Sequence, residues 1–150
     1  MNDLLNLLRR QARLTNAELA SQVSSTEAEV QAQIAAWEAD GTIRGYQAMV
    51  DPAHDGEGGV TAFIEVRLTP ERGGGFDRLA RRISRFEEVT SCYLASGGYD
   101  LLVLVEGDDL FSVAAFVSGK LSSIEGVIST ATHFRLKSYK ENGFLFGEEL

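Results

Sequence analysis

Very few residues of this sequence have the types and the spacing that covalent or metal chemistry requires. The 150 residues include one cysteine, Cys92, and two histidines, His54 and His133, which lie far apart in the chain. None of these three has a partner at zinc-ligand spacing, and a single cysteine cannot form an intramolecular disulfide. A nucleophile elbow, a phosphate-binding loop and an HExxH motif are all absent from the sequence. We therefore expect no metal site, no cofactor and no catalytic residue, and we interpret the chain as a protein other than an enzyme.

Recognition of DNA bases is a second kind of chemistry, and polar side chains in residues 26–40 could perform it. Gln31 and Gln33 could pair with adenine, and Glu27 could accept a hydrogen bond from cytosine. This segment contains no lysine or arginine, and the whole chain has a net charge of −8. Phosphate contacts dominate the affinity of proteins for DNA, so the positive charge has to come from elsewhere. The arginines near this segment in the sequence are Arg9, Arg10, Arg13 and Arg44.

Two short helices are predicted to carry these polar side chains, and each begins with a capping box. Thr15 with Glu18 marks the start of the first helix, and Thr26 with Glu29 marks the start of the second. Apolar residues follow each capping box at helical spacing, which gives each helix one buried side. The arrangement predicts a helix-turn-helix.

The flanking residues extend this motif into a complete module. Leucines at helical spacing predict a further helix over residues 2–12, and Gly41 is typical of a helix C-terminus. An extended segment over residues 43–50 is expected to form the start of a wing. Residues 1–50 are therefore predicted to form a winged helix-turn-helix, a module that places its last helix in the major groove of DNA.

A linker rich in proline and glycine, residues 51–59, is expected to separate this module from a second domain over residues 60–150. Apolar periodicity in that domain predicts the order strand, helix, strand, strand, helix, strand. The six elements are expected at residues 60–68, 76–86, 89–95, 99–107, 110–121 and 127–139. This order is that of a ferredoxin-like βαββαβ domain, so the predicted fold class is α+β. Helices on one face of the sheet leave the other face uncovered, and we expect dimerisation through that face.

The N-terminus gives an expectation about location. The sequence MNDLLNLLRRQ is too short and too charged for a signal peptide, and no apolar run approaches the length of a membrane span. We expect a cytoplasmic protein that has no membrane partner.

The order of a winged helix-turn-helix, a short linker and a ferredoxin-like domain resembles the Lrp/AsnC family of transcriptional regulators. These are bacterial and archaeal proteins that respond to amino acids or related small molecules. The resemblance covers nearly the whole chain. It is carried by Leu4, Leu5 and Leu8, the run Arg13 to Ala20, Trp37-Glu38, the run Gly41 to Tyr46, the run Gly98 to Leu102, Gly126-Val127, Thr130 and Thr132.

The resemblance implies a sequence-specific DNA-binding regulator that forms dimers and often tetramers or octamers. It implies double-stranded DNA as a partner, contacted by Arg13, Thr15, Asn16, Thr26, Glu27, Ala28, Gln31, Gln33 and Arg44. It also implies a small-molecule effector, such as an amino acid, bound between dimers near Gly97, Gly98, Tyr99, Asp100, Thr130 and Thr132. In that site the Asp100 carboxylate would accept from the α-amino group, while backbone N–H groups would meet the effector carboxylate.

The sequence departs from the family pattern and leaves two other functions open. The first helix lacks the usual opening turn, and Gln31, Gln33, Ala35 and Ala36 occupy positions where the family commonly has arginine or lysine. The chain could therefore be an assembly or small-molecule-binding module with weak or lost DNA binding.

Glycines at 97–98 could serve a hairpin turn alone. Siroheme decarboxylases look similar to this chain in overall architecture, but two scattered histidines disfavour a tetrapyrrole cleft.

Overall fold

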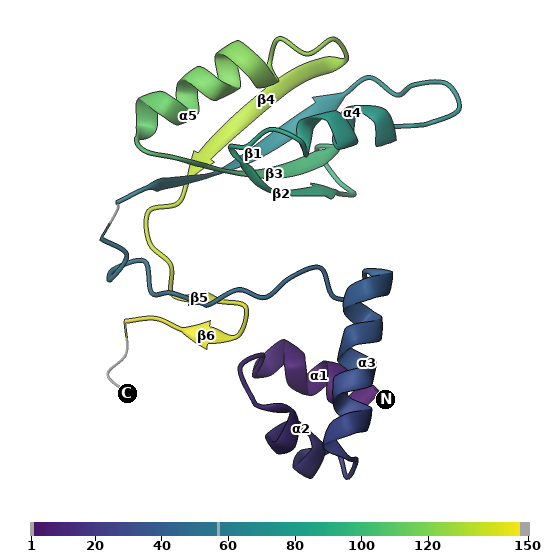
Figure 1. Ribbon diagram of the computed structural model, residues 1–150. Helices are drawn as coiled ribbons and strands as arrows, with labels where there is room; N and C mark the ends of the chain where they lie inside the picture. The colour runs from purple at the N-terminus through teal and green to yellow at the C-terminus, as the bar shows by residue number, and fades with distance from the viewer. Residues whose placement is uncertain (1, 57, 148–150) are drawn as a thin grey trace. The chain divides into compact units, whose positions relative to one another are not determined.

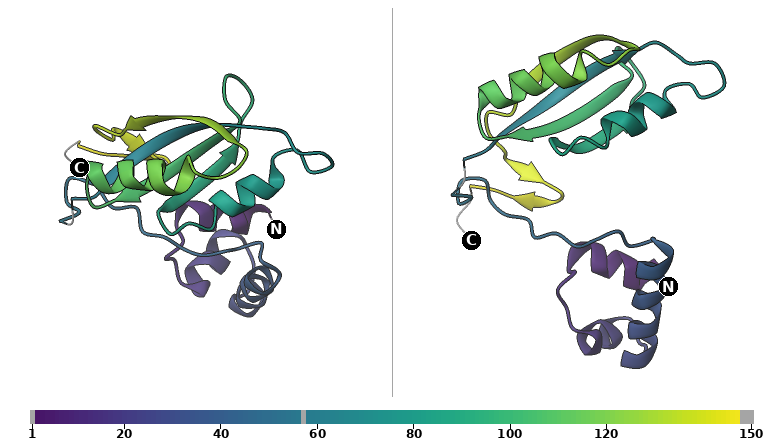
Figure 2. Two further views of the ribbon diagram at one scale, coloured as in Figure 1. Left: turned by 90° about the horizontal axis from the view of Figure 1, so that it is seen from above. Right: turned by 45° about the horizontal axis from the view of Figure 1, so that its top comes forward.

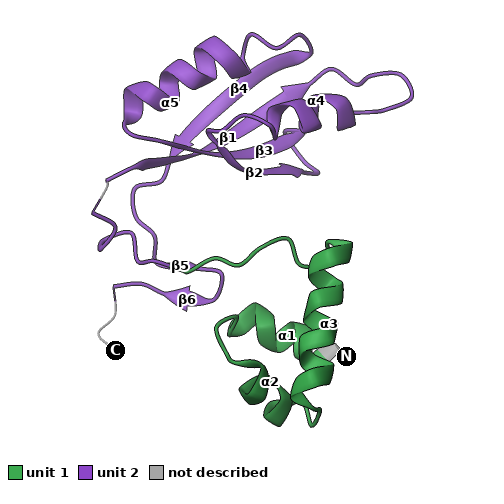
Figure 3. Cartoon of the chain, viewed as in Figure 1, with its two compact units in different colours: residues 1–49 green, residues 50–150 purple. Residues whose placement is uncertain are grey.

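The chain folds into two compact units, Met1–Met49 and Val50–Leu150 (Figure 3). The computed structural model describes residues 2–56 and 58–147. Within these residues no helix is long and apolar enough to cross a membrane. Each unit has its own hydrophobic core.

The first unit consists of the three helices α1 (Asn2–Arg10), α2 (Asn16–Gln22) and α3 (Glu27–Asp40) (Figure 1). Side chains at helical spacing form its core, because residues three, four or seven positions apart share one side of a helix. The buried members are Leu4, Leu8, Leu19, Ala20, Val30 and Trp37. This core holds α1 against the helix-turn-helix formed by α2 and α3.

Both predicted capping boxes are confirmed. Glu18 N donates to Thr15 Oγ1 at 3.2 Å, and Thr15 N donates to Glu18 Oε2 at 2.8 Å. The second box has the same pair of bonds between Thr26 and Glu29, both at 3.2 Å. The turn between the helices passes through Ser24, whose φ of 53° lies in the left-handed region that a non-glycine residue rarely adopts.

The predicted wing strand is wrong for the described residues, because residues 42–50 form no strand. Two residues at the start of this segment bond to α3: Ile43 N donates to Trp37 O at 3.0 Å, and the Tyr46 hydroxyl donates to Glu38 Oε1 at 2.9 Å. The predicted left-handed helix end is confirmed at Gly41, where φ is 80°. A strand forms only when its backbone pairs with a second strand, and the backbone N–H of Ile43 bonds to α3 instead.

The second unit has the predicted ferredoxin-like topology, an antiparallel sheet of strand order β2-β3-β1-β4. Its elements are β1 (Val60–Leu68), α4 (Asp77–Ile83), β2 (Val89–Leu94), β3 (Leu101–Gly107), α5 (Leu110–Phe116) and β4 (Val127–Phe134). The helix that begins with α5 continues as one π-helical segment, Val117–Leu121. The fold class α+β is confirmed.

Both helices pack on the same face of this sheet (Figure 2). Strand residues two positions apart point to one side, and the predicted inward set of β1 is confirmed because Ala62, Ile64, Val66 and Leu68 are all buried. These residues pack with Leu101, Val103 and Val105 of β3, Leu79 and Ile83 of α4, and Val113 and Phe116 of α5.

The opposite side, which we call the helix-free face, carries the alternate residues of the same strands. Phe63 pairs across the sheet with Leu104, and Leu102 pairs with Tyr93. The first three of these side chains are half-buried, and Tyr93 is 55% exposed. No helix of the second unit covers this face among the described residues.

A small hairpin of β5 (Lys140–Glu141) and β6 (Phe144–Leu145) follows the sheet and was not predicted. Its two turn residues, Asn142 and Gly143, both have positive φ, 48° and 91°. Two consecutive positive φ angles are typical of a type I′ hairpin turn, for which Asn-Gly is a preferred sequence.

Candidate DNA-binding and effector sites

The exposed side of α3 is mostly alanine. Val30 and Trp37 mark its buried side, so residues half a turn away from them face solvent. The small exposed residues on that outer side are Ala28, Ala32, Ala35 and Ala39. Their methyl groups can contact a thymine methyl and allow the helix to approach DNA bases closely. The outer side of α3 can therefore read bases, but it carries no positive charge.

Three polar residues of α3 were predicted to contact DNA, and they occupy different environments. Gln31 and Glu27 are exposed. Gln33 is half-buried and lines a cavity of about 370 Å³ that also includes Asp3 and Ser24. Gln31 is therefore better placed than Gln33 to meet a base edge.

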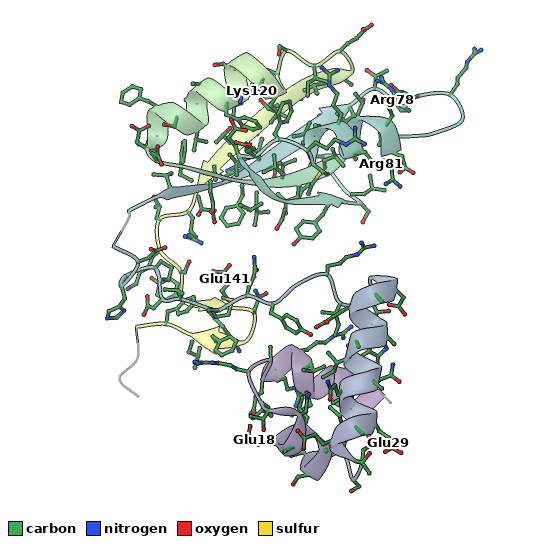
Figure 4. The ribbon with its side chains drawn as sticks, viewed as in Figure 1. Glu18, Glu29, Arg78, Arg81, Lys120 and Glu141 are labelled. Atoms are coloured by element: carbon green, nitrogen blue, oxygen red, sulfur yellow. The ribbon has the colours of Figure 1, made fainter. Side chains whose placement is uncertain are left out.

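The capping residues lie at the starts of α2 and α3, where they stabilise the helix ends. Figure 4 labels two of them, Glu18 and Glu29. The predicted DNA contacts Thr15 and Thr26 are exposed but use their hydroxyls as N-caps. The Ser25 hydroxyl, which donates to Glu29 Oε2 at 2.6 Å, and the Thr26 N–H hold the pKa of Glu29 below its ordinary value. The leading end of α3 is thus negatively charged at neutral pH.

The arginines expected to hold phosphate are exposed. Within the described part of the chain, no ion pair involves Arg9, Arg10, Arg13 or Arg44. Arg9 and Arg44 line one cavity of about 300 Å³, formed by α1 and residues 42–47, and no acidic residue lines it. The Arg44 guanidinium lies against Gly41, where a side-chain Cβ would come within 2.9 Å of Arg44 Cζ. Two of the four arginines in residues 1–50 therefore line this cavity. Asn16, the remaining predicted contact, is half-buried at the start of α2.

The predicted effector turn lies at the end of the sheet where β2 returns to β3. Asp100 N donates to Val66 O at 3.0 Å, and Asp100 Oδ2 accepts from Leu68 N at 2.7 Å. Arg67 Nε donates to Gly98 O at 2.9 Å. One oxygen of the Asp100 carboxylate therefore joins this turn to β1. Arg67 was not predicted to contact this turn, because it lies 31 positions from Gly98 in the sequence and no local pattern links the two.

The other predicted effector residues differ in exposure and position. Gly97 and Gly98 are exposed, Gly97 with a φ of 128°, and Tyr99 is half-buried. Thr130 and Thr132 pair with Val66 and Ile64, so they lie on the helix-covered face of β4 and are half-buried. The Thr130 hydroxyl is 3.4 Å from that of Ser122. Thr130 and the turn at residues 97–100 both lie near the C-terminal end of β1, but they contact opposite edges of that strand.

The remaining reactive side chains form no site among the described residues. Cys92 is free and half-buried. His54 Nδ1 lies 3.6 Å from Asp51 Oδ2, and His133 Nε2 lies 3.7 Å from Glu65 Oε2. The described part of the chain contains no group of three or more residues that could hold a metal ion.

Comparison with known proteins gives the same architecture. The family model described as the Lrp/AsnC ligand binding domain matches residues 61–145. The uncharacterised helix-turn-helix transcriptional regulator YugG of Bacillus subtilis is 45% identical over 96% of this chain and 87% of that protein. The proline dehydrogenase transcriptional activator of Rhodobacter capsulatus is 32% identical over 92% of this chain and 89% of that protein. A transcriptional regulator of Neisseria meningitidis, solved as a complex with L-methionine, is 28% identical, covers 92% of this chain and 88% of its own, and has a TM-score of 0.71.

Proposed function

The chain belongs to the Lrp/AsnC family of transcriptional regulators, and from that premise we propose that it binds double-stranded DNA as a homo-oligomer that responds to an amino acid. Its family is one of helix-turn-helix regulators and not of enzymes. We place its action in the cytoplasm. The single observation that carries the DNA-binding proposal is the helix-turn-helix itself, with both helices capped and one side of α3 exposed.

Base recognition and phosphate binding are assigned to different residues. Gln31 is exposed next to the alanines of α3, so it can meet a base edge. The four exposed arginines described above supply the phosphate contacts, because α3 contains no lysine or arginine. Arg9 and Arg44 are the best placed of these, since they line one cavity without an acidic residue.

A selection on random-sequence duplex DNA at low salt tests this division of roles. Gln31→Ala is expected to relax the preference at one base pair, since a bidentate contact is worth about 1–3 kcal/mol. Arg44→Gln is expected to weaken binding to all sequences alike and to reduce the salt slope by about 1. Arg10→Gln removes the same charge outside the cavity, so it is the comparison for Arg44→Gln and is expected to weaken binding less.

A second function is favoured by one observation, the negative leading end of α3. Glu27 and Glu29 would repel phosphates, as expected of an assembly or small-molecule-binding module that no longer binds DNA. If the wild-type protein selects no DNA at low salt, with and without amino acids, this second function replaces the first.

The effector is proposed to be an amino acid bound near the turn at residues 97–100, with Thr130 and Thr132 nearby. The Neisseria meningitidis relative was solved with L-methionine, and the second Asp100 oxygen could accept from an α-amino group. A thermal-shift screen of the twenty amino acids tests this site. Asp100→Asn is the informative variant, because its amide oxygen can still accept from Leu68 N while the negative charge is lost. We expect the ligand-induced shift to disappear while the unliganded melting temperature changes little.

We propose that the helix-free face forms the dimer, since its apolar side chains are not covered by the second unit's own helices. Tyr93→Glu is expected to shift the protein toward monomer in size-exclusion chromatography with light scattering. Phe111→Glu, at a residue of α5 that is 86% exposed, is the matched control and is expected to leave the dimer unchanged. A dimer that survives Tyr93→Glu and Leu104→Glu would contradict this interface.

A further inference from the structure

Four arginines occupy one side of α4 and the turn after it. Arg78, Arg81, Arg82 and Arg85 are separated by three or four positions, and such residues share one side of a helix. The helical course continues as far as Arg85, whose N–H donates to Arg82 O at 3.2 Å. Figure 4 shows Arg78 and Arg81 on the outer side of α4. We call these four residues the α4 arginine face.

Three of these arginines have no partner in the described part of the chain. Arg78 binds Glu71, with its Nε 3.0 Å from both carboxylate oxygens. Arg81, Arg82 and Arg85 are exposed, and no hydrogen bond or ion pair from their guanidinium groups is formed within the described residues. At three of the four positions of the α4 arginine face, no acidic side chain of the described residues therefore neutralises the positive charge.

This concentration of positive charge is unusual for the chain. Residues 51–150 contain ten basic and sixteen acidic residues, a net charge of −6. Within residues 72–85 the balance is reversed, since five arginines stand against one acid, Asp77. Like charges three and four positions apart destabilise a helix. A bound polyanion would relieve this repulsion.

We propose that the α4 arginine face is a second DNA-contacting surface, which binds phosphates of double-stranded DNA in addition to those held by the first unit. This inference rests on the proposed function, in which double-stranded DNA is the partner of this chain. Guanidinium groups match phosphate geometry and form bidentate, charge-assisted hydrogen bonds. DNA is favoured over an acidic protein surface because α3 contributes no cation, so phosphate contacts outside it must supply the affinity.

The decisive variant is Arg81→Gln/Arg82→Gln/Arg85→Gln, tested on a duplex taken from the random-sequence selection. Each phosphate neutralised on B-DNA contributes about 0.9 to the slope of log affinity against log salt. Three lost contacts should reduce the slope by about 2.7. Between 50 and 200 mM salt, the wild-type affinity should therefore fall about 40-fold more than that of the variant. The preferred sequence should not change, because phosphate contacts carry no sequence information.

The matched control replaces the same three arginines with lysine. This variant keeps the charge on the same side of α4, so its salt slope should stay close to that of the wild type. All three positions are exposed and have no ion-pair partner among the residues that the structure describes, and circular dichroism of both variants checks that the fold is retained.

Each alternative outcome is distinct. If the wild type binds DNA and the glutamine variant keeps its salt slope, the α4 arginine face is not a DNA surface, although the proposed function stands. If the glutamine variant keeps its slope but dissociates in light scattering, the face binds an acidic surface of a second copy, and the proposal is overturned. If the wild type itself binds no DNA at low salt, the proposed function fails.

Discussion

Replacement of Gly126 by alanine should destabilise the second unit strongly, and the structure gives the size of the effect. Gly126 has a φ of 99°, a conformation that side chains with a Cβ rarely adopt. A Cβ placed there would lie 2.7 Å from Cδ1 of Leu79, a residue of α4 whose side chain is fully buried in the core. The Gly126 carbonyl also accepts from Thr69 N at 2.8 Å, which limits how far the backbone can move.

Two terms add in this variant. The left-handed backbone costs a residue with a Cβ about 1–2 kcal/mol. Overpacking of a closed core costs typically about 1–3 kcal/mol. The free energy of unfolding should therefore fall by about 2–5 kcal/mol, which moves the urea midpoint by about 1–3 M for an m value near 1.5 kcal/mol/M.

Urea unfolding followed by far-UV circular dichroism measures this change. Trp37, the single tryptophan, lies in the first unit, so its fluorescence reports that unit and serves as an internal reference. Gly119→Ala is the matched control, because Gly119 lies in the π-helical segment and a Cβ added there would meet nothing within 4 Å. That control should be neutral or stabilising by about 0.5–1 kcal/mol, as alanine is a better helix former. A Gly126→Ala protein as stable as Gly119→Ala would refute the reasoning.

Three further predictions concern the helix caps and one ion pair. Ser24→Gly should stabilise the first unit by up to about 1 kcal/mol, since glycine adopts a φ of 53° without strain, and the Trp37 fluorescence transition should move to higher urea. Thr26→Ala should destabilise that unit by about 1 kcal/mol through loss of the N-cap of α3, while Thr26→Ser should retain most of the stability. Lys120 Nζ donates to Glu88 Oε1 at 2.6 Å, and this bond lowers the pKa of Glu88 in the folded protein. The ion pair therefore stabilises the fold fully above pH 4.5, the ordinary pKa of the group, and this stabilisation is lost as the pH falls through the lower folded-state pKa. Glu88→Gln should therefore lose less stability than the wild type when acidified to about pH 3, and an equal loss in both proteins would count against the pair.

Local sequence signals predicted the elements of this fold well where the cause of the structure was itself local. The capping boxes at Thr15 and Thr26 involve residues three positions apart, so they can be identified in the sequence alone. The alternation of β1 predicted which residues face the core for the same reason. The order of strands and helices then left few topologies to consider.

Two of the features that the sequence did not predict depend on contacts between distant residues, and a third has a local signal in the sequence. The wing was wrong because an extended segment becomes a strand only when it finds a partner, and Ile43 and Tyr46 bond to α3 instead. The bond from Leu68 N to Asp100 joins residues 32 positions apart, so no local pattern predicts it. The hairpin at Asn142-Gly143 was different, because that dipeptide is a recognised turn signal that was overlooked. The DNA and effector contacts of individual residues stay predictions.

The reciprocal capping of α2 and α3 has a consequence for the thermodynamics of recognition. Four hydrogen bonds between backbone N–H groups and side chains hold the two helix starts before any ligand arrives, so α3 would lose little conformational entropy on entering a groove of DNA. Free arginine side chains are different, since each carries about 2 kcal/mol of rotamer entropy that is lost in part on binding. If α3 reads bases as proposed, the helix is already ordered before binding, while the exposed arginines still have rotamer freedom to lose. The loss of conformational entropy on DNA binding should therefore come from the arginines and not from α3.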